Sequence, residues 1–100
     1  MNKMDYLVNE ATFLMNNVMH IMPGDIRKDW KNRREFISGK NKMVYVEEVY
    51  LYFIELVELG IEDLSCYYPE FKELRRGYME QYDESLPTLP DFSMNYKSNN

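Results

Sequence analysis

Apolar residues recur along this chain at the three- and four-residue spacing of an α-helix, most clearly in the stretch MVYVEEVYLYFIELVELG at positions 43–60. At about 100° per residue, its four glutamates fall within one arc of about 100°, and almost every position outside that arc is apolar. On a strand, the adjacent Glu47 and Glu48 would point to opposite faces. The pattern therefore predicts a core helix over 43–59 with one acidic edge, ended by a left-handed Gly60.

Three further segments have amphipathic helical spacing, and they predict helices near 3–22, 26–38 and 69–82. The last of these contains Gly77, which costs about 1 kcal/mol relative to alanine in a helix interior. The sequence thus predicts an all-α fold, a small bundle of about four helices around the central apolar helix.

Local signals predict where these helices begin. Asn2 or Asp5 is suited to cap the first helix, and Asp25 to cap the second. Pro69 fits the first turn of the last helix, because a residue there needs no intrahelical N–H donor. Between the third and fourth helices we expect a connector over 61–68 that can hold one helical turn starting at Glu62.

The same helical wheels predict which side chains form the core. The residues expected to be largely buried come from all four helices: Val49, Tyr50, Phe53, Leu56, Val57, Leu14, Val18, Trp30 and Leu74.

The chain changes character at position 83, where DESLPTLPDFSMNYKSNN begins. Its two prolines, three residues apart, disfavour a helix and favour an extended path. We therefore expect one helical domain over 1–82 and an extended tail over 83–100. Leu86, Leu89 and Phe92 would let the tail pack on the helices as a strap, or dock on another protein. The residues 97–100 are expected to be disordered.

Charge is distributed unevenly in this chain of net charge −5. Residues 25–42 carry seven bases and three acids, whereas residues 43–71 carry seven acids and no base. A single cysteine excludes an internal disulfide and favours a reducing compartment. The N-terminus has no secretion-signal pattern, and the glutamates interrupt the longest apolar run. We therefore expect a cytoplasmic protein.

The acids of the central helix are the first candidate site. They share one face and are here called the acidic ridge: Glu47, Glu48, Glu55, Glu58 and Glu62. A carboxylate metal site would normally add histidines at matching spacing, and the sequence lacks them. We therefore interpret the ridge as a surface for a basic protein partner, with at least Glu48, Glu55 and Glu58 exposed.

Two other patterns are candidate surfaces. Arg27, Lys31 and Arg34 align on one face of the second predicted helix, and Lys40 and Lys42 extend the positive charge. This face could be solvated, could pair with acids of a neighbouring helix, or could contact an acidic protein or nucleic acid.

Tyr6, Phe13 and His20 recur every seven residues opposite the apolar stripe of the first helix. They would form either a second packed surface within the chain or an interface with a partner or a second copy. A metal or catalytic role for His20 is disfavoured, because the chain has one histidine. Cys66 has no neighbouring base in sequence and is expected to be a buried structural thiol.

No catalytic residue, metal site or cofactor is predicted, so the chain is not expected to be an enzyme. The interpretation favoured by the sequence is a small acidic inhibitor or adaptor of the kind frequent in phages and mobile elements. Its expected partner is a protein with a basic surface, including one that handles nucleic acid. The alternatives are a nucleic-acid-associated protein that uses the basic segment 27–42, and a structural subunit of a larger assembly. Direct binding to nucleic acid or membrane is not expected, and a homo-oligomer remains open.

Overall fold

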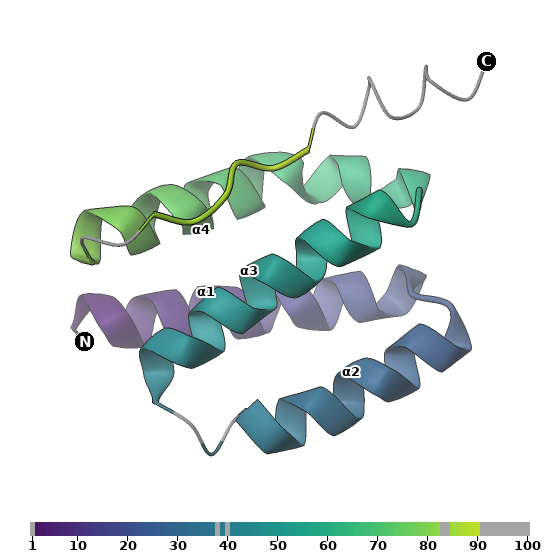
Figure 1. Cartoon of the computed structure of the whole chain (residues 1–100), viewed down its shortest axis with the longest axis horizontal. Helices are drawn as coiled ribbons and strands as arrows, with labels where there is room; N and C mark the ends of the chain where they lie inside the picture. Colours follow the sequence, from purple (N-terminus) through teal and green to yellow (C-terminus); the bar gives the residue numbers. More distant parts are fainter. Residues whose placement is uncertain (1, 38, 40, 83–84, 91–100) are drawn as a thin grey trace.

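The structure is a computed structural model, and it describes residues 2–37, 39, 41–82 and 85–90. The elements in chain order are α1 (Lys3–Val18), η1 (Met19–Ile21), α2 (Gly24–Ile37), α3 (Lys42–Glu58), η2 (Glu62–Tyr67) and α4 (Tyr68–Gln81), where η denotes a 3₁₀-helix. The predicted all-α bundle is confirmed. Figure 1 shows α3 crossing in front of α1, with α4 along one side of it and α2 along the other.

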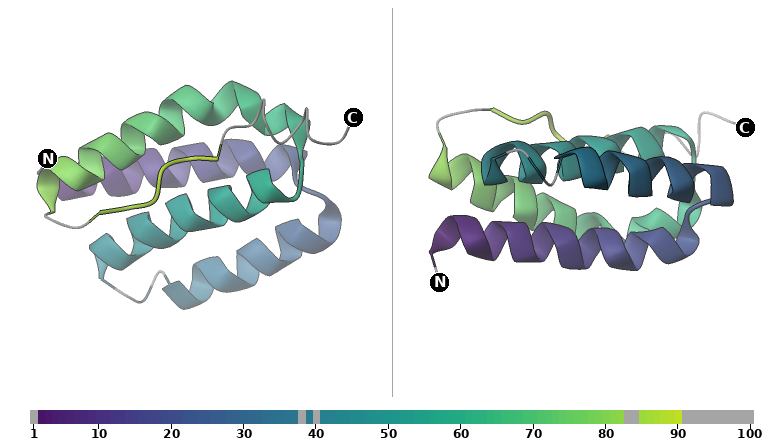
Figure 2. Two further views of the ribbon diagram at one scale, coloured as in Figure 1. Left: turned by 45° about the horizontal axis from the view of Figure 1, so that its top comes forward. Right: turned by 90° about the horizontal axis from the view of Figure 1, so that it is seen from below.

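The central position of α3 follows from its composition. Eight of its residues are buried, and every residue that the sequence predicts for the core is buried as well. Tyr45, on the side of α3 opposite Glu47, hydrogen-bonds Thr12 of α1 through the two hydroxyl groups, which lie 2.8 Å apart. α1 therefore packs against the back of α3, and the glutamates of α3 face the other way. Figure 2 shows α1 in one layer of the bundle and α2 and α3 in the other.

Aromatic contacts join the outer helices to α3. The rings of Phe53 and Phe71 are stacked, with centroids 3.8 Å apart and an interplanar angle of 8°, which links α3 to α4. Trp30 of α2 stacks on Tyr52 of α3 with centroids 5.1 Å apart. Because such pairs add to the hydrophobic effect, these contacts fix α2 and α4 on either side of α3.

Most helix ends agree with the sequence signals. The side chain of Asn2 accepts a hydrogen bond of 2.8 Å from the backbone N–H of Asp5, which caps α1. Gly60 has φ of 83°, as predicted for the residue that ends α3. The prediction for Asp25 was wrong, because α2 begins one residue earlier and Asp25 lies in its first turn. There the backbone N–H of Arg27 already donates to the carbonyl of Pro23 at 2.9 Å.

Residues 85–90, here called the strap, run extended along α3 and α4 on the side of the bundle away from α1 (Figure 2). Leu86 is buried, and Tyr50 donates its hydroxyl hydrogen to the carbonyl of Pro87. Arg75 donates from Nε to the carbonyls of Leu86 and Pro87, each at 3.0 Å, and Tyr68 donates to Pro90. The backbone carbonyls of an extended segment outside a sheet or helix have no regular hydrogen-bond donors, and these side chains provide them. The expectations for Phe92 and for 97–100 lie outside the described residues.

Burial changes the acidity of two tyrosines beneath these contacts. Desolvation raises the pKa of Tyr50 to about 12. Desolvation also raises the pKa of Tyr52 to about 12, and the neighbouring Asp29 adds to the effect.

Within the part of the chain that the structure describes, none of the helices combines the length and apolar content that a membrane crossing requires.

Candidate functional site

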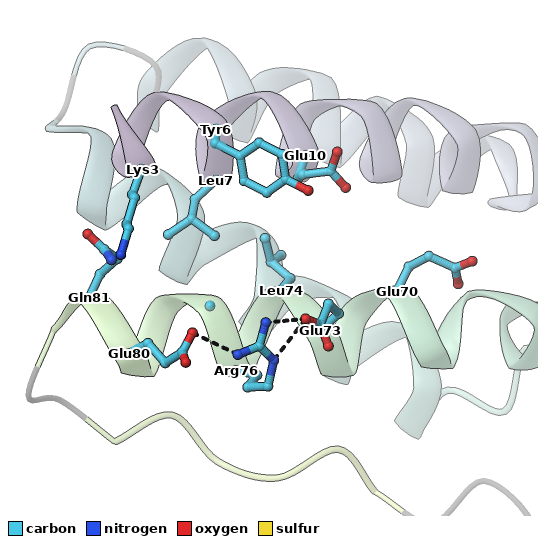
Figure 3. A pocket seen from close by; sticks show the side chains of 11 residues that line it. Lys3, Tyr6, Leu7, Glu10, Glu70, Glu73, Leu74, Arg76, Glu80 and Gln81 are labelled. Atoms are coloured by element: carbon cyan, nitrogen blue, oxygen red, sulfur yellow. Dashed lines mark hydrogen bonds and ion pairs between the residues drawn. The ribbon is translucent and has the colours of Figure 1, made fainter. Parts of the chain in front are cut away.

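A groove of about 270 Å³ runs between α1 and α4, on the side of α4 away from the strap (Figure 3). Its floor is formed by Leu7 of α1 and by Leu74 and Gly77 of α4. Its walls carry polar and charged side chains, which are Lys3, Tyr6, Glu10, Glu70, Glu73, Arg76, Glu80 and Gln81. An apolar floor with charged walls is the usual composition of a binding site.

Gly77 keeps the floor of the groove open. A Cβ atom at this position would lie 3.0 Å from Cδ2 of Leu7, so any side chain here would press on α1. The glycine has a helical conformation without positive φ, and it is not required by the backbone. A glycine inside a helix lowers helix stability relative to alanine. The close contact between Leu7 and position 77 explains why a glycine is nevertheless found here.

Three charged side chains on one wall of the groove pair with one another. Arg76 donates from Nε to Glu73 at 2.8 Å and from Nη1 to Glu80 at 2.7 Å. The hydrogen bond from Arg76 lowers the pKa of Glu73, and the two carboxylates raise the pKa of the Arg76 guanidinium above its ordinary value. Arg76 therefore offsets one of the two carboxylate charges, and the three groups together keep about one negative charge near pH 7.

Two other carboxylates in the groove are not neutralised. Glu10 of α1 and Glu70 of α4 have no ion pair or hydrogen bond with the described residues. Figure 3 shows Glu10 beside Tyr6 near the middle of the groove and Glu70 farther toward one end, whereas Lys3 and Gln81 lie at the other end. Tyr6, with 58% of its surface exposed, stands on the rim beside Glu10. The groove thus combines an apolar floor, an exposed ring and a pair of unpaired acids.

The acidic ridge predicted from the sequence lies on the opposite face, on the side of α3 away from α1. Glu55 and Glu58 are exposed, as predicted. The prediction for Glu48 was wrong, because its side chain is half-buried, one helical turn from the buried Tyr45 and Tyr52.

Glu47 is half-buried as well and accepts a hydrogen bond of 3.2 Å from the hydroxyl of Tyr78. The side chain of Glu62 lies outside the described residues. The exposed surface of the ridge is therefore smaller than the sequence predicted. Glu55 and Glu58 are exposed, whereas Glu47 and Glu48 are only partly accessible to solvent.

Among the described residues, the ridge has one basic neighbour in close contact. Arg33 of α2 lies 3.6 Å from Glu55 and 3.5 Å from Asp29, measured between guanidinium nitrogen and carboxylate oxygen. Both partners in the Arg33–Glu55 pair remain well exposed, so the pair is a weak surface contact. Within the described residues, Arg27, Lys31 and Arg34 of α2 form no ion pair with a glutamate of the ridge.

Arg27, Lys31 and Arg34 instead line a hollow of about 360 Å³ together with His20, Met19 and Asn16 from the end of α1 and the turn after it. The expected extension of this positive patch fails at Lys42, which forms an ion pair with Asp5 of α1. Lys40 lies outside the described residues.

The heptad-spaced residues of α1 are exposed. Phe13 has 64% of its surface exposed, and Tyr6 and His20 are exposed as well. The described helices do not cover this face, so the interpretation as a second packed surface is not supported there.

Cys66 was expected to be buried and is exposed. In η2 the three-residue period buries Leu64 and turns the residues after it outward.

Among the described residues, no group of three or more histidine, cysteine, aspartate or glutamate side chains is arranged to hold a metal ion. Comparison of the chain with protein-family models, with curated proteins and with solved structures gives no significant match.

The groove was missed in the sequence because it depends on which helices are neighbours. Helical periodicity shows which face of α1 and of α4 is apolar, but it does not show that the two faces meet at Leu7 and Gly77. One signal was available, since a glycine inside a regular helical pattern often has a packing or binding reason.

Proposed function

We propose that this chain is a non-enzymatic protein-binding module that recognises a basic segment of another protein in the groove between α1 and α4. The observation that carries the proposal is the combination of an apolar floor with two carboxylates, Glu10 and Glu70, that line the same groove without a partner among the described residues. This combination is complementary to a segment in which a large apolar side chain lies near a lysine or arginine.

Each part of the groove has a separate task in this proposal. The floor of Leu7, Leu74 and Gly77 takes the apolar side chain, whose burial is worth about 1.5–3 kcal/mol. Glu10 and Glu70 each offer a charge-assisted hydrogen bond to a basic side chain of the segment, one from each wall. The exposed ring of Tyr6 offers its face to the cation that pairs with Glu10.

The acidic ridge on α3 supports the same choice of partner from the opposite face. Its exposed acids, Glu55 and Glu58, add a negative field that speeds the approach of a basic protein without forming an apolar contact. We propose that the ridge increases the association rate, while the groove determines how long the complex lasts.

A module of this size that holds a basic segment would act as an inhibitor, by covering a basic surface, or as an adaptor. A basic surface that handles nucleic acid is a natural target, because carboxylates can occupy the place of phosphates. The single cysteine supports a cytoplasmic location for this interaction.

The proposal is tested with a library of short peptides in which basic and apolar residues are varied independently. We expect selected peptides to contain a lysine or arginine within one helical turn of a leucine, methionine or phenylalanine. The double variant Glu10→Gln/Glu70→Gln should weaken their binding at least about tenfold, as expected when charge-assisted hydrogen bonds are lost.

The matched control is Glu55→Gln/Glu58→Gln on the ridge, which removes the same charge from the other face. It should change the equilibrium affinity by much less than the groove variant does. Selection of peptides without basic residues, or equal losses in the two double variants, would contradict the assignment of the groove.

A further inference from the structure

The hollow between the end of α1 and α2 gathers positive charge in a chain that is acidic overall. Arg27, Lys31 and Arg34 approach it from α2, and His20 lies in the turn that follows α1. No carboxylate is among the described residues that line it. Like charges at helical spacing repel one another, so this arrangement is unfavourable for folding unless an anion is present.

Arg27 is fixed in the hollow by the backbone. Its Nε donates to the carbonyl of Met19 at 2.9 Å, and its Nη2 donates to the carbonyl of Met22 at 3.0 Å. These carbonyls belong to the turn that follows α1, so the guanidinium is held without a carboxylate partner. Nη1 makes no hydrogen bond with the described residues. The side chain is therefore ordered in advance, with donor capacity left for a ligand.

The other two bases have no partner within the described residues. Neither Lys31 nor Arg34 forms an ion pair there, although their neighbour Arg33 contacts Asp29 and Glu55. The acids that contact Arg33 lie on the side of α2 toward α3, and Glu35, one helical turn after Lys31, does not line the hollow. His20 adds a ring N–H donor in either protonation state.

We propose that this hollow binds a phosphate monoester group carried by a small molecule. A monoester carries a charge of about −1.5 to −2 near pH 7 and three acceptor oxygens, which suits three cations and an imidazole that converge from two elements. The volume of about 360 Å³ is in the range of small-molecule sites, about 300–1,000 Å³. The diester of nucleic acid carries a single charge per phosphate and fits this set less well. The site is separate from the groove, which involves the other end of α1.

The test is a titration of the full chain with inorganic phosphate, observed by NMR. The chain has one histidine, so every imidazole signal belongs to His20. We expect phosphate to shift the His20 and Arg34 side-chain signals saturably, while sodium chloride at equal ionic strength does not. In Lys31→Gln/Arg34→Gln the affinity should fall at least about tenfold.

The control is Lys28→Gln, which removes one positive charge from an exposed position of α2 that does not line the hollow. It should retain the phosphate affinity of the parent within about a factor of two, the scale of a distant surface charge. A single-stranded oligonucleotide provides the other arm. Absence of a saturable shift with phosphate, an equal loss in Lys28→Gln, or tight binding of the oligonucleotide without binding of phosphate would each overturn the proposal.

Discussion

Leu7 of α1 packs directly over Gly77 of α4, and a Cβ atom at position 77 would lie 3.0 Å from the Cδ2 atom of Leu7. The pair forms the floor of the groove between the two helices. Alanine at this position would favour the helix by about 1 kcal/mol, while its methyl group would push the end of the Leu7 side chain.

We therefore expect Gly77→Ala to change the free energy of unfolding by less than about 1 kcal/mol, since the two effects oppose each other. The same variant should weaken the binding of a selected basic peptide at least about tenfold, because the methyl group occupies the floor that takes the apolar side chain. Urea denaturation and fluorescence anisotropy measure the two effects. Gly24→Ala is the control, since nothing lies within 4 Å of a Cβ there. Unchanged peptide affinity in Gly77→Ala would show that the floor is not the contact.

The stacked rings of Phe53 and Phe71 are expected to dominate the stability of the bundle. Phe53 is fully buried, and Phe53→Ala should cost about 3–5 kcal/mol, a large share of a total of about 5–15 kcal/mol. Thermal and urea unfolding followed by circular dichroism test this value. A melting temperature within a few degrees of the parent would show that the core can close around the missing ring.

Tyr50 should make stability depend on alkaline pH. Its pKa is raised to about 12 in the folded chain from an ordinary value of 10.0, so the folded state holds the phenolic proton more tightly than the unfolded state. The resulting contribution to stability is complete below pH 10 and is lost as the pH rises through about 12.

The variant Tyr50→Phe separates this effect from other ionisations. At pH 8 it should be less stable by about 1 kcal/mol, since the hydrogen bond to Pro87 is lost. Between pH 9 and pH 11.5, about the range over which an exposed tyrosine ionises, its stability should fall less steeply than that of the parent. Urea midpoints across this range provide the measurement. Parallel pH profiles would contradict the assignment to Tyr50.

The ridge and the groove should differ in kinetics. Reversal of the ridge acids in Glu48→Lys/Glu55→Lys/Glu58→Lys should leave the helical spectrum nearly intact, because two of these side chains are exposed and the third is half-buried. Stopped-flow measurements with a selected basic peptide should show slower association and a weaker dependence on salt, with a nearly unchanged dissociation rate. An unchanged association rate would show that the ridge does not attract the partner.

The elements of the fold could be predicted from the sequence because each depends on local spacing. The apolar periodicity of α3, the left-handed Gly60 and the capping Asn2 involve residues close together in the chain. Glu48 was misjudged because a helical wheel treats an arc as uniform, whereas burial at its edge depends on the size of Tyr45 and Tyr52.

The candidate sites depend on contacts between distant segments, and these were harder to predict. The alignment of Arg27, Lys31 and Arg34 was evident from the sequence, but the approach of His20 depends on the angle of the turn between α1 and α2. The pairing of α1 with α4 brings Glu10 into the same groove as Glu70, sixty positions later, and no local pattern contains that information.

NMR mapping of a selected peptide shows most directly whether the groove between α1 and α4 holds a basic segment with an apolar anchor. We expect the largest amide shifts at Leu7, Leu74 and Gly77, a shift of the Tyr6 ring with them, and little change at Glu55 and Glu58. Shifts concentrated at Glu55 and Glu58, with the amides of Leu7 and Gly77 unchanged, would contradict this expectation.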